Sequence, residues 1–455
     1  MRKKSRSWLI LPVFLLLFSN LLFGCSAFTG SSRENPTGGV EASKKNKDGT
    51  VSLSISTWGA PDELAVFKEL VSNFEKDHPN IKLRIIHIPN DYSGKMNTML
   101  AGGTAPDIVF VSDGDFGRWV KAGLFLNIQE MVDNSDIKLD DMWESALGRY
   151  KFDGKRLGQG DLYALPKDIG PSVLYYNKEL FDKAGLPYPD PKKPMTIEEF
   201  RDLAIKLTID KNKDGKPEQY GSGPIWWEAF VWSNGGEVLN KDRTEFVLNS
   251  PEAVEALQFV ADMTFKYHAA PDPKALQAMS ADQMFETGRV AMVFNGRWMV
   301  PTYRKLKFDW DVAPIPVGKT GISTGWSGSV GYAINKKTKF PKEAFEVIRY
   351  LAGEEGQKIQ TKLGFAIPTY KSLSNTDLFL QPGQKPEHAE VFIEAAKNQR
   401  PGIWTLTPNN KWLDMLNQKL ADLWNGKKSA KELMDSIKPG IDKALKEGNP
   451  ELFEK

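Results

Sequence analysis

The chain contains very little cysteine and histidine, which limits the chemistry that it can perform. Its 455 residues include a single cysteine, Cys25, so an intrachain disulfide and a cysteine-based zinc site are both excluded. The four histidines, His78, His87, His268 and His388, occur at unrelated spacings. The sequence therefore suggests neither a histidine metal site nor a histidine acid–base pair.

The chain also lacks an excess of charge of either sign. It has 60 basic and 58 acidic residues, and the first 24 positions hold four of the basic residues and no acid, which leaves 56 basic against 58 acidic residues. A near-neutral protein presents no broad positive field, so a nucleic-acid partner is not expected. The hydrophobic share of 41% and the charged share of 26% are those of a folded globular chain.

Motifs of several common enzyme classes are missing as well. Neither G-x-S-x-G nor H-E-x-x-H occurs, and Gly325–Ser329 misses the first motif by its last residue. Residues 313–320 resemble a phosphate-binding loop, but Ala313 replaces the first glycine and two prolines remove backbone N–H groups that would hold phosphate. No catalytic residue and no catalytic cofactor are therefore predicted.

An apolar run near the N-terminus is too short to cross a bilayer. It covers the eleven residues Trp8–Phe18, whereas a spanning helix needs about 20, and it follows a basic segment. Soon after it, Leu21-Leu22-Phe23-Gly24-Cys25 resembles the lipobox of bacterial lipoproteins. We therefore predict a signal peptide over 1–24 and lipid (palmitate) attachment at Cys25. A plain signal peptide cleaved elsewhere is the alternative.

Residues 25–50 are rich in Ser, Gly, Asn and Lys and show no hydrophobic periodicity. Such a segment cannot bury a core, so we predict a flexible tether. The folded part should then hang from the cell membrane through the lipid on Cys25. Its expected location is the outer face of the cytoplasmic membrane.

The folded part begins with a pattern typical of a parallel α/β sheet. Apolar residues alternate over 51–56 and 81–85 and form a short buried run over 107–111, and helical spacing separates these strands. This order predicts a parallel sheet with right-handed crossovers. Trp58 and Asp113 each follow a strand, which is where ligands bind in such sheets. The later helices are predicted over 196–207, 251–264, 411–424 and 431–437.

One polar loop resembles the front half of a calcium-binding EF-hand loop. Oxygen-bearing side chains stand at its positions 1, 3, 5 and 9, and Gly215 stands at position 6, but Gly221 occupies position 12, where the motif has a bidentate glutamate. We predict a structural calcium ion of modest affinity, and a polar turn without metal is the alternative. The candidate ligands are Asp210, Asn212, Asp214, Lys216, Glu218 and Gln219.

Several short segments gain meaning from their order and spacing. They are 56–59, 103–109, 174–181, 184–186, 195–200, 285–292, 295–298 and 328–332. Together they resemble the extracellular solute-binding lipoproteins of bacterial sugar ABC importers, the group that includes maltose-binding protein. The calcium-like loop is similar to one found in some members, notably alginate-binding ones.

This resemblance implies an α/β protein of two lobes with hinge strands between them, like other periplasmic binding proteins. The first lobe is expected over 51–171 plus 311–368, and the second over 172–310 plus 369–455. An oligosaccharide or sugar derivative would bind in the cleft between the lobes, and closure would present the complex to the permease subunits. The protein would be a monomer and not an enzyme.

Aromatic rings can stack on the flat C–H faces of a sugar, while carboxylates, amides and arginine bond its hydroxyl groups. The candidate ligand-binding residues chosen on this basis are Trp58, Asp113, Asp115, Trp226, Trp227, Trp232, Arg297, Trp298, Trp326, Gly328, Trp404 and Trp412. By resemblance, Trp298, Trp412 and the pair 226–227 correspond to sugar-stacking positions. Val111 and Gly114 depart from maltose-binding protein, which argues against maltose itself. Packing in the core is the competing explanation for each tryptophan.

Two other functions remain open from the sequence. A lipid-anchored polysaccharide hydrolase or lyase would carry a pair of carboxylates across its cleft. A binding protein for another solute, such as a metal, would need ligands that the scattered histidines and the single lipidated cysteine do not offer.

Overall fold

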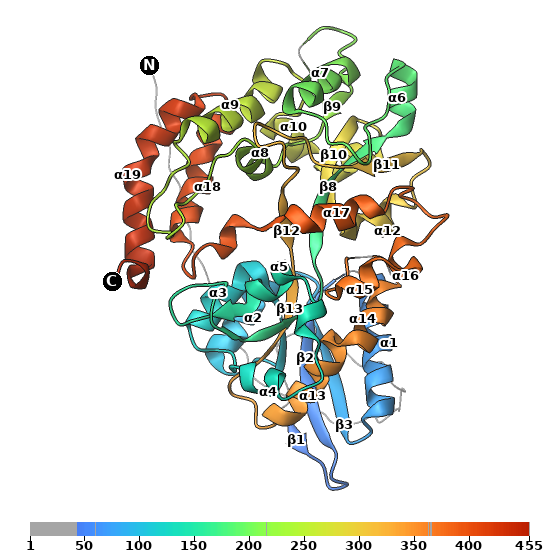
Figure 1. Cartoon of the computed structure of the whole chain (residues 1–455), viewed down its shortest axis with the longest axis vertical. Coiled ribbons are helices and arrows are strands. Elements are labelled where there is room, and N and C mark those ends of the chain that lie inside the picture. Colours follow the sequence, from blue (N-terminus) through green and yellow to red (C-terminus); the bar gives the residue numbers. More distant parts are fainter. Residues whose placement is uncertain (1–42, 60, 215, 363, 365, 455) are drawn as a thin grey trace, which may run out of the picture. The chain divides into compact units, whose positions relative to one another are not determined.

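Two six-stranded sheets organise this computed structural model, which describes residues 43–455 apart from 60, 215, 363, 365 and 455 (Figure 1). The predictions for Cys25, the signal peptide and residues 25–42 fall outside the described residues. Within the described part, no helix is long and apolar enough to cross a membrane. The α/β class predicted from the sequence is confirmed.

The first sheet has the strand order β1-β2-β4-β13-β7, with β3 on the other side of β2. Its strands are β1 Lys44–Lys45, β2 Val51–Thr57, β3 Ile81–His87, β4 Ile108–Ser112, β7 Ala164–Pro166 and β13 Val330–Ile334. Strand β2 pairs in parallel with both β3 and β4, as the alternating pattern predicted. The other elements of this region are α1 Pro61–Asp77, α2 Tyr92–Gly102, α3 Asp113–Lys121, α4 Gln129–Asp133, η1 Leu139–Asp141, α5 Glu144–Leu147, η2 Gly148–Tyr150, β5 Lys151–Phe152, β6 Asp161–Leu162, α13 Pro341–Ala352, α14 Glu354–Thr361 and α15 Lys371–Ser374. Helix α16 Asp377–Leu380 follows α15, and its Phe379 packs in the core of the second sheet.

The end of the expected tether is folded, which corrects the prediction for residues 43–50. Lys44 and Lys45 pair antiparallel with Ser52 and Val51 at the edge of the first sheet. The turn between them closes with a 2.8 Å bond from the Asn46 N–H to the Thr50 carbonyl. A two-residue edge strand buries little apolar surface, so it leaves no hydrophobic pattern in the sequence.

The second sheet has the order β14-β12-β8-β10-β9, with β11 also paired to β8. Its strands are β8 Gly170–Asn177, β9 Tyr220–Ser222, β10 Val290–Gly296, β11 Trp310–Ala313, β12 Trp326–Gly328 and β14 Arg400–Pro401. The pairing of β11 and β12 with β8 places residues 311–313 and 326–328 in this sheet, whereas the resemblance had assigned 311–368 to the first lobe. Tyr370 and Leu373 likewise pack against Met142 and Leu147 of the first region, whereas the resemblance had assigned 369–455 to the second lobe. The other lobe boundaries stay a prediction.

Helices cover both faces of the second sheet (Figure 1). The helices of this lobe are α6 Lys178–Ala184, α7 Ile197–Leu207, α8 Trp227–Ser233, α9 Pro251–Phe265, α10 Pro273–Ala278, α11 Ala281–Glu286, η3 Arg297–Met299, α12 Val300–Tyr303, α17 Glu390–Asn398, η4 Ile403–Thr405, α18 Lys411–Trp424, α19 Ala430–Gly448 and η5 Pro450–Leu452. Helix α7 begins with a capping box between Thr196 and Glu199, which fixes its start at the predicted residue.

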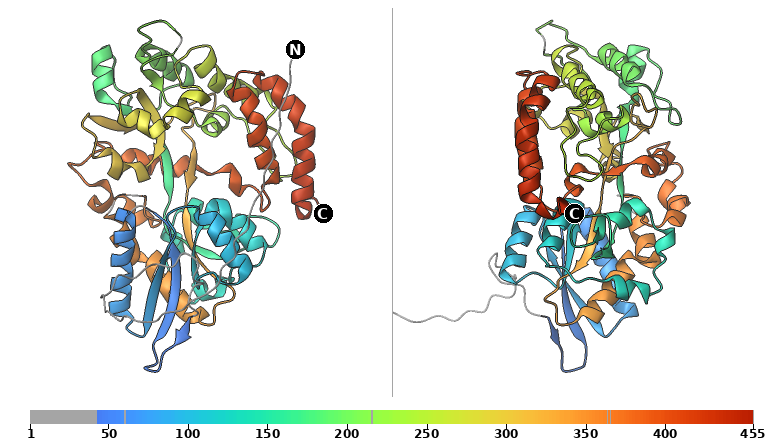
Figure 2. Two further views of the ribbon diagram at one scale, coloured as in Figure 1. Left: turned by 180° about the vertical axis from the view of Figure 1, so that it is seen from behind. Right: turned by 60° about the vertical axis from the view of Figure 1, so that its left-hand side comes forward.

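Helix α19 is longer than its sequence pattern predicted, because it continues past residue 437 and through Pro439. Ile437, Ile441 and Leu445 recur on its buried side, so apolar packing continues beyond the proline. Helices α18 and α19 lie side by side along one flank of the second lobe (Figure 2).

Each sheet has its own hydrophobic core, and this separates the two lobes. Ile55 and Phe74 are fully buried in the first core, and Phe230 and Leu416 are fully buried in the second. The chain crosses between the sheets from β7 to β8 and again from β12 to β13. A β-bridge between Ile169 and Ile367 marks a further crossing segment beside them. Short crossing segments of this kind are suited to act as hinges.

Candidate functional site

Four partly exposed tryptophans from four segments of the second lobe form one aromatic group, which we name the tryptophan cluster: Trp226, Trp298, Trp326 and Trp404. Trp226 and Trp326 have ring centroids 4.4 Å apart and planes inclined by 20°. Trp298 is 6.1 Å from Trp326 at 18°, and Trp404 stands across Trp326 at 5.2 Å and 72°. The sequence predicted all four as candidate ligand contacts, and the structure brings them together.

A buried ion pair from the first lobe supports this cluster. The indole N–H of Trp404 donates to Asp113 Oδ1 at 2.8 Å, and the Arg149 guanidinium donates to Asp113 Oδ2 and to the Ser327 carbonyl. Burial raises the pKa of the Asp113 carboxyl, and Arg149 and the indole N–H oppose this rise. Asp113 therefore links the indole of Trp404 to the guanidinium of Arg149.

Glu228 follows Trp226 by two residues, in the first turn of α8. Its side chain is partly exposed, and burial raises the pKa of its carboxyl from 4.5 to about 7. No charged group contributes to this shift. A carboxyl in such a place can accept a hydrogen bond from a hydroxyl when ionised and donate one when protonated.

Four of the predicted contacts lie in the core and do not join the cluster. Trp412 is 0% exposed, and its indole N–H donates to Thr407 Oγ1 at 2.7 Å. Trp227 is also buried, while Trp232 packs under the Arg400 guanidinium, 4.6 Å from its ring centroid. The packing explanation therefore fits these three tryptophans.

Arg297 is likewise 0% exposed, so the structure does not offer it to a ligand. Its guanidinium donates to the Phe379 carbonyl and lies 4.2 Å from the centroid of the Phe379 ring. Burial lowers the pKa of Arg297 to about 10.

The predicted residues of the first lobe also have local partners. Trp58 is partly buried and meets the rings of Tyr92 and Phe110 at 4.6 and 5.6 Å. Asp115 accepts hydrogen bonds from Ser93 and from Arg118 on its own helix. Neither residue contacts the tryptophan cluster through these interactions.

Gly328, the remaining predicted residue, belongs to the second sheet. It lies in β12 and pairs with Gly170 of β8.

The calcium-like loop closes as a short exposed hairpin. Its ends meet at a bridge between Ile209 and Gln219, while Asn212 and Asp214 accept bonds from backbone N–H groups two residues further on. Glu218 accepts a 2.9 Å bond from the Lys211 N–H, and Gly215 is outside the described residues. Among the described residues of this loop, no three acidic side chains come within 4.8 Å of one another. Such a convergence of acidic and histidine side chains occurs elsewhere, at Asp311, Glu387 and His388.

Sequence reasoning missed Arg149, Ser327 and Glu228. Arg149 is separated in the sequence from Asp113 by 36 positions and from Ser327 by 178 positions, so no local motif marks these partners. Glu228 could have been noticed as an acid beside two tryptophans, but nothing in the sequence tells which of the three side chains is exposed.

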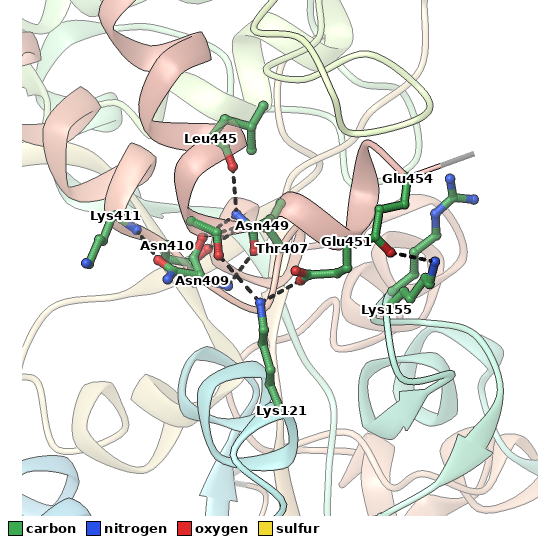
Figure 3. A network of polar contacts seen from close by, with 12 residues as sticks. Lys121, Lys155, Thr407, Asn409, Asn410, Lys411, Leu445, Asn449, Glu451 and Glu454 are labelled. Carbon is green, nitrogen blue, oxygen red and sulfur yellow. Dashed lines mark hydrogen bonds and ion pairs between the residues drawn. The ribbon is translucent and has the colours of Figure 1, made fainter.

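A second set of contacts joins the lobes at the end of the chain (Figure 3). Lys121, the last residue of α3, pairs with Glu451 at 2.6 Å, and Lys155 pairs with Glu454 at 3.2 Å. The buried Asn449 holds the turn that carries both glutamates, because its side chain exchanges hydrogen bonds with the backbone of Asn409.

Residues 59–358 match the model of the family described as bacterial extracellular solute-binding protein. The chain belongs to this family. Among its relatives, the galactooligosaccharide-binding protein of Bacillus subtilis is 23% identical over 87% of this chain and 90% of the relative. The maltodextrin-binding protein of the same organism is 25% identical over 72% of each chain.

Solved structures of binding proteins share the fold. An ABC substrate-binding protein from Listeria monocytogenes in complex with cycloalternan superposes with a TM-score of 0.76 and 25% identity, covering 87% of this chain and 98% of that one. A maltose-bound protein from T. maritima gives a TM-score of 0.68 at 21% identity, covering 87% and 99%. The two-lobed architecture expected from the resemblance is thereby confirmed.

Proposed function

We propose that this protein binds an oligosaccharide or sugar derivative at the tryptophan cluster and delivers it to the permease of an ABC importer. The observation that carries the proposal is the cluster itself. Four indoles from four separate segments lie against one another here, and each of them remains partly exposed, so together they offer aromatic surface to a ligand.

The chemistry of the cluster suits a sugar. Stacking an indole on a pyranose removes apolar C–H surface from water, which contributes about 25 cal/mol per Å². The sugar hydroxyls would then need polar partners. Glu228 is a suitable partner, because it lies in the first turn of α8, next to Trp226 at the start of that helix. The relatives named for galactooligosaccharide, maltodextrin and cycloalternan support this class of ligand, although they do not agree on one sugar.

A thermal-shift screen of the purified folded part tests the proposal. A ligand that binds only the folded state raises the melting temperature, so at least one of galactooligosaccharide, maltodextrin and cycloalternan should do so. If every saccharide leaves the melting temperature unchanged while a peptide or a polyamine raises it, the proposal fails.

We propose further that the protein is not an enzyme. The relatives named above are binding proteins, and the hydrolase or lyase alternative has no support from them. Release of reducing sugar from a bound oligosaccharide would contradict this part of the proposal.

We also propose that a lipid on Cys25 anchors the protein, as a monomer, to the outer face of the cytoplasmic membrane. The lipobox-like residues 21–25 support the anchor. Mass spectrometry of the N-terminal peptide from the native host should show Cys25 carrying acyl chains, and Cys25→Ala should release the protein from the membrane. A mature N-terminus at another residue would contradict this.

The loop 210–219 is proposed to hold a structural calcium ion. Its oxygen-rich composition supports the proposal, whereas its carboxylates do not already converge. Calcium but not magnesium should raise the melting temperature of the protein, and Asp214→Ala should remove that rise. An equal response of the variant and the parent protein to calcium would argue for a polar turn alone.

A further inference from the structure

We propose that Gly170 is a positioning residue for the saccharide site, because its bare backbone lets the Trp298 ring lie against the strand. Gly170 opens β8, directly after the chain has crossed from the first sheet to the second. Trp298 comes from η3, much later in the chain, and belongs to the tryptophan cluster. The two residues are therefore brought together only by the fold.

The space at Gly170 is occupied by the indole. A Cβ atom added there would lie 2.9 Å from Cζ3 and 3.0 Å from Cε3 of Trp298. These separations are too short for carbon atoms in contact, so a side chain at 170 would displace the ring. The third neighbour, the Gly328 carbonyl oxygen at 3.7 Å, would be in ordinary contact. The effect of a side chain at 170 thus falls on Trp298.

Backbone conformation does not explain the glycine. Gly170 is not among the glycines with φ in the left-handed region, and it pairs with Gly328 in an antiparallel ladder. Any residue can adopt such an extended conformation. Gly296 of strand β10 must also lack a side chain, because a Cβ atom there would lie 1.9 Å from Trp298 Cζ3. Two strands therefore lack a side chain where the ring passes.

The location of Gly170 links the indole to the crossing segment between the lobes. Trp298 lies nearly parallel to Trp326, inclined by 18°, and we infer that this angle depends on the missing side chain at 170. A contact between Trp298 and a saccharide rests on the function proposed above. The dependence of Trp298 on Gly170 does not, so the two ideas can be tested apart.

A double-mutant cycle tests the proposal without any ligand. The four proteins are the parent, Gly170→Ala, Trp298→Ala and the double variant, and the measurements are near-ultraviolet circular dichroism and thermal unfolding. Gly102→Ala is the matched control, because its Cβ would meet only Thr104 Oγ1, at 3.8 Å. That control should leave the tryptophan spectrum of the parent unchanged.

We expect Gly170→Ala to change the tryptophan spectrum and to lower the melting temperature by about 2 to 4 °C. Both effects should vanish when Trp298 is already alanine. If the single variant does not fold, a folded double variant supports the proposal by rescue. Equal effects of Gly170→Ala in both backgrounds, or no effect in either, would overturn it.

Saccharide affinities of the same variants test whether the position of the Trp298 ring matters for binding. For whichever of galactooligosaccharide, maltodextrin or cycloalternan raises the melting temperature, Gly170→Ala should weaken binding by about fivefold in the parent and not in the Trp298→Ala background. A further outcome is that the circular dichroism and unfolding measurements show Gly170→Ala to act through Trp298 while no saccharide binds. That outcome would keep Gly170 as a positioning residue and would reject the proposed ligand class. An unchanged affinity in Gly170→Ala would reject its role in binding.

Discussion

Neighbouring residues have opposite surroundings in two of the segments that supply the tryptophan cluster. Trp226 joins the cluster while Trp227 is buried, and Arg297 is buried while Trp298 joins the cluster. The sequence identifies both pairs as candidates, because composition and spacing show that aromatic residues gather there. Which member of each pair is exposed depends on where α8 and η3 begin, and no local capping signal in the sequence marks these starts.

At this scale the first prediction concerns Trp298. We expect Trp298→Ala to weaken oligosaccharide binding by about 30-fold, since removing a central aromatic contact costs about 2 kcal/mol. Isothermal titration calorimetry with the saccharide found in the thermal-shift screen measures this. Trp424→Ala is the matched control, because Trp424 is a partly buried tryptophan of the second lobe outside the cluster, and it should change affinity by less than about twofold. Equal losses in the two variants would refute a special role for Trp298.

A second prediction concerns Glu228 and pH. Burial raises the pKa of its carboxyl from 4.5 to about 7, so the folded state holds the proton more tightly than the unfolded state. The stability from this proton is full below pH 4.5 and is lost as the pH rises through about 7. Glu228→Gln removes the penalty of the buried charge, so above neutral pH the variant should be more stable by on the order of 2 kcal/mol.

Melting temperatures of the parent and Glu228→Gln, compared across this pH range, check the prediction. The difference in melting temperature between the two proteins should increase as the pH rises and decrease as the pH falls. Glu447→Gln, at an exposed position on α19, serves as the control and should show no such trend. A gap that does not vary with pH would mean that Glu228 ionises freely in the folded protein.

At the scale of elements, helix α3 connects the lobes along its whole length. Its first residue, Asp113, holds Trp404, and its last, Lys121, pairs with Glu451 of the C-terminal turn. Between them Gly117 lies so close to the second lobe that a Cβ atom there would be 3.2 Å from Pro408 Cα. This helix therefore carries contacts from the tryptophan cluster to the end of the chain.

The ion pair at the end of α3 should help to hold the lobes together. Lys121→Glu or Glu451→Lys alone should lengthen the distance between spin labels on the two lobes, measured by pulsed electron paramagnetic resonance without ligand. The double variant restores opposite charges and should recover the parent distance. The exposed pair Lys431–Asp435 within α19 offers a control reversal that should change nothing. Identical distances in all variants would show that this pair does not influence closure.

The order of elements was largely predictable from the sequence. Strict alternation gave the first strands correctly, and the threonine and serine caps gave the starts of α7 and α9, because these signals are local. Strand β1 and the part of α19 beyond residue 437 were missed, since the strand is too short to show a pattern and the helix contains Pro439. The partners of Asp113 could not be predicted because they lie in distant segments.

At the scale of the whole folded part, two sheets with separate cores are joined by crossing strands and by the α3 contacts. The tryptophan cluster belongs to the second lobe, and the first lobe reaches it through Asp113 and Arg149. Rotation of the lobes about the crossing segments would therefore alter the support of Trp404. We infer that ligand binding and closure are coupled through this pair.

The most direct test of this account is a crystal structure of the protein with the saccharide that stabilises it in the thermal-shift screen. A sugar ring should lie in van der Waals contact with an indole face of Trp226, Trp298 or Trp404. A saccharide bound away from these three indoles, or an intact cluster that a non-sugar ligand occupies, would contradict the account.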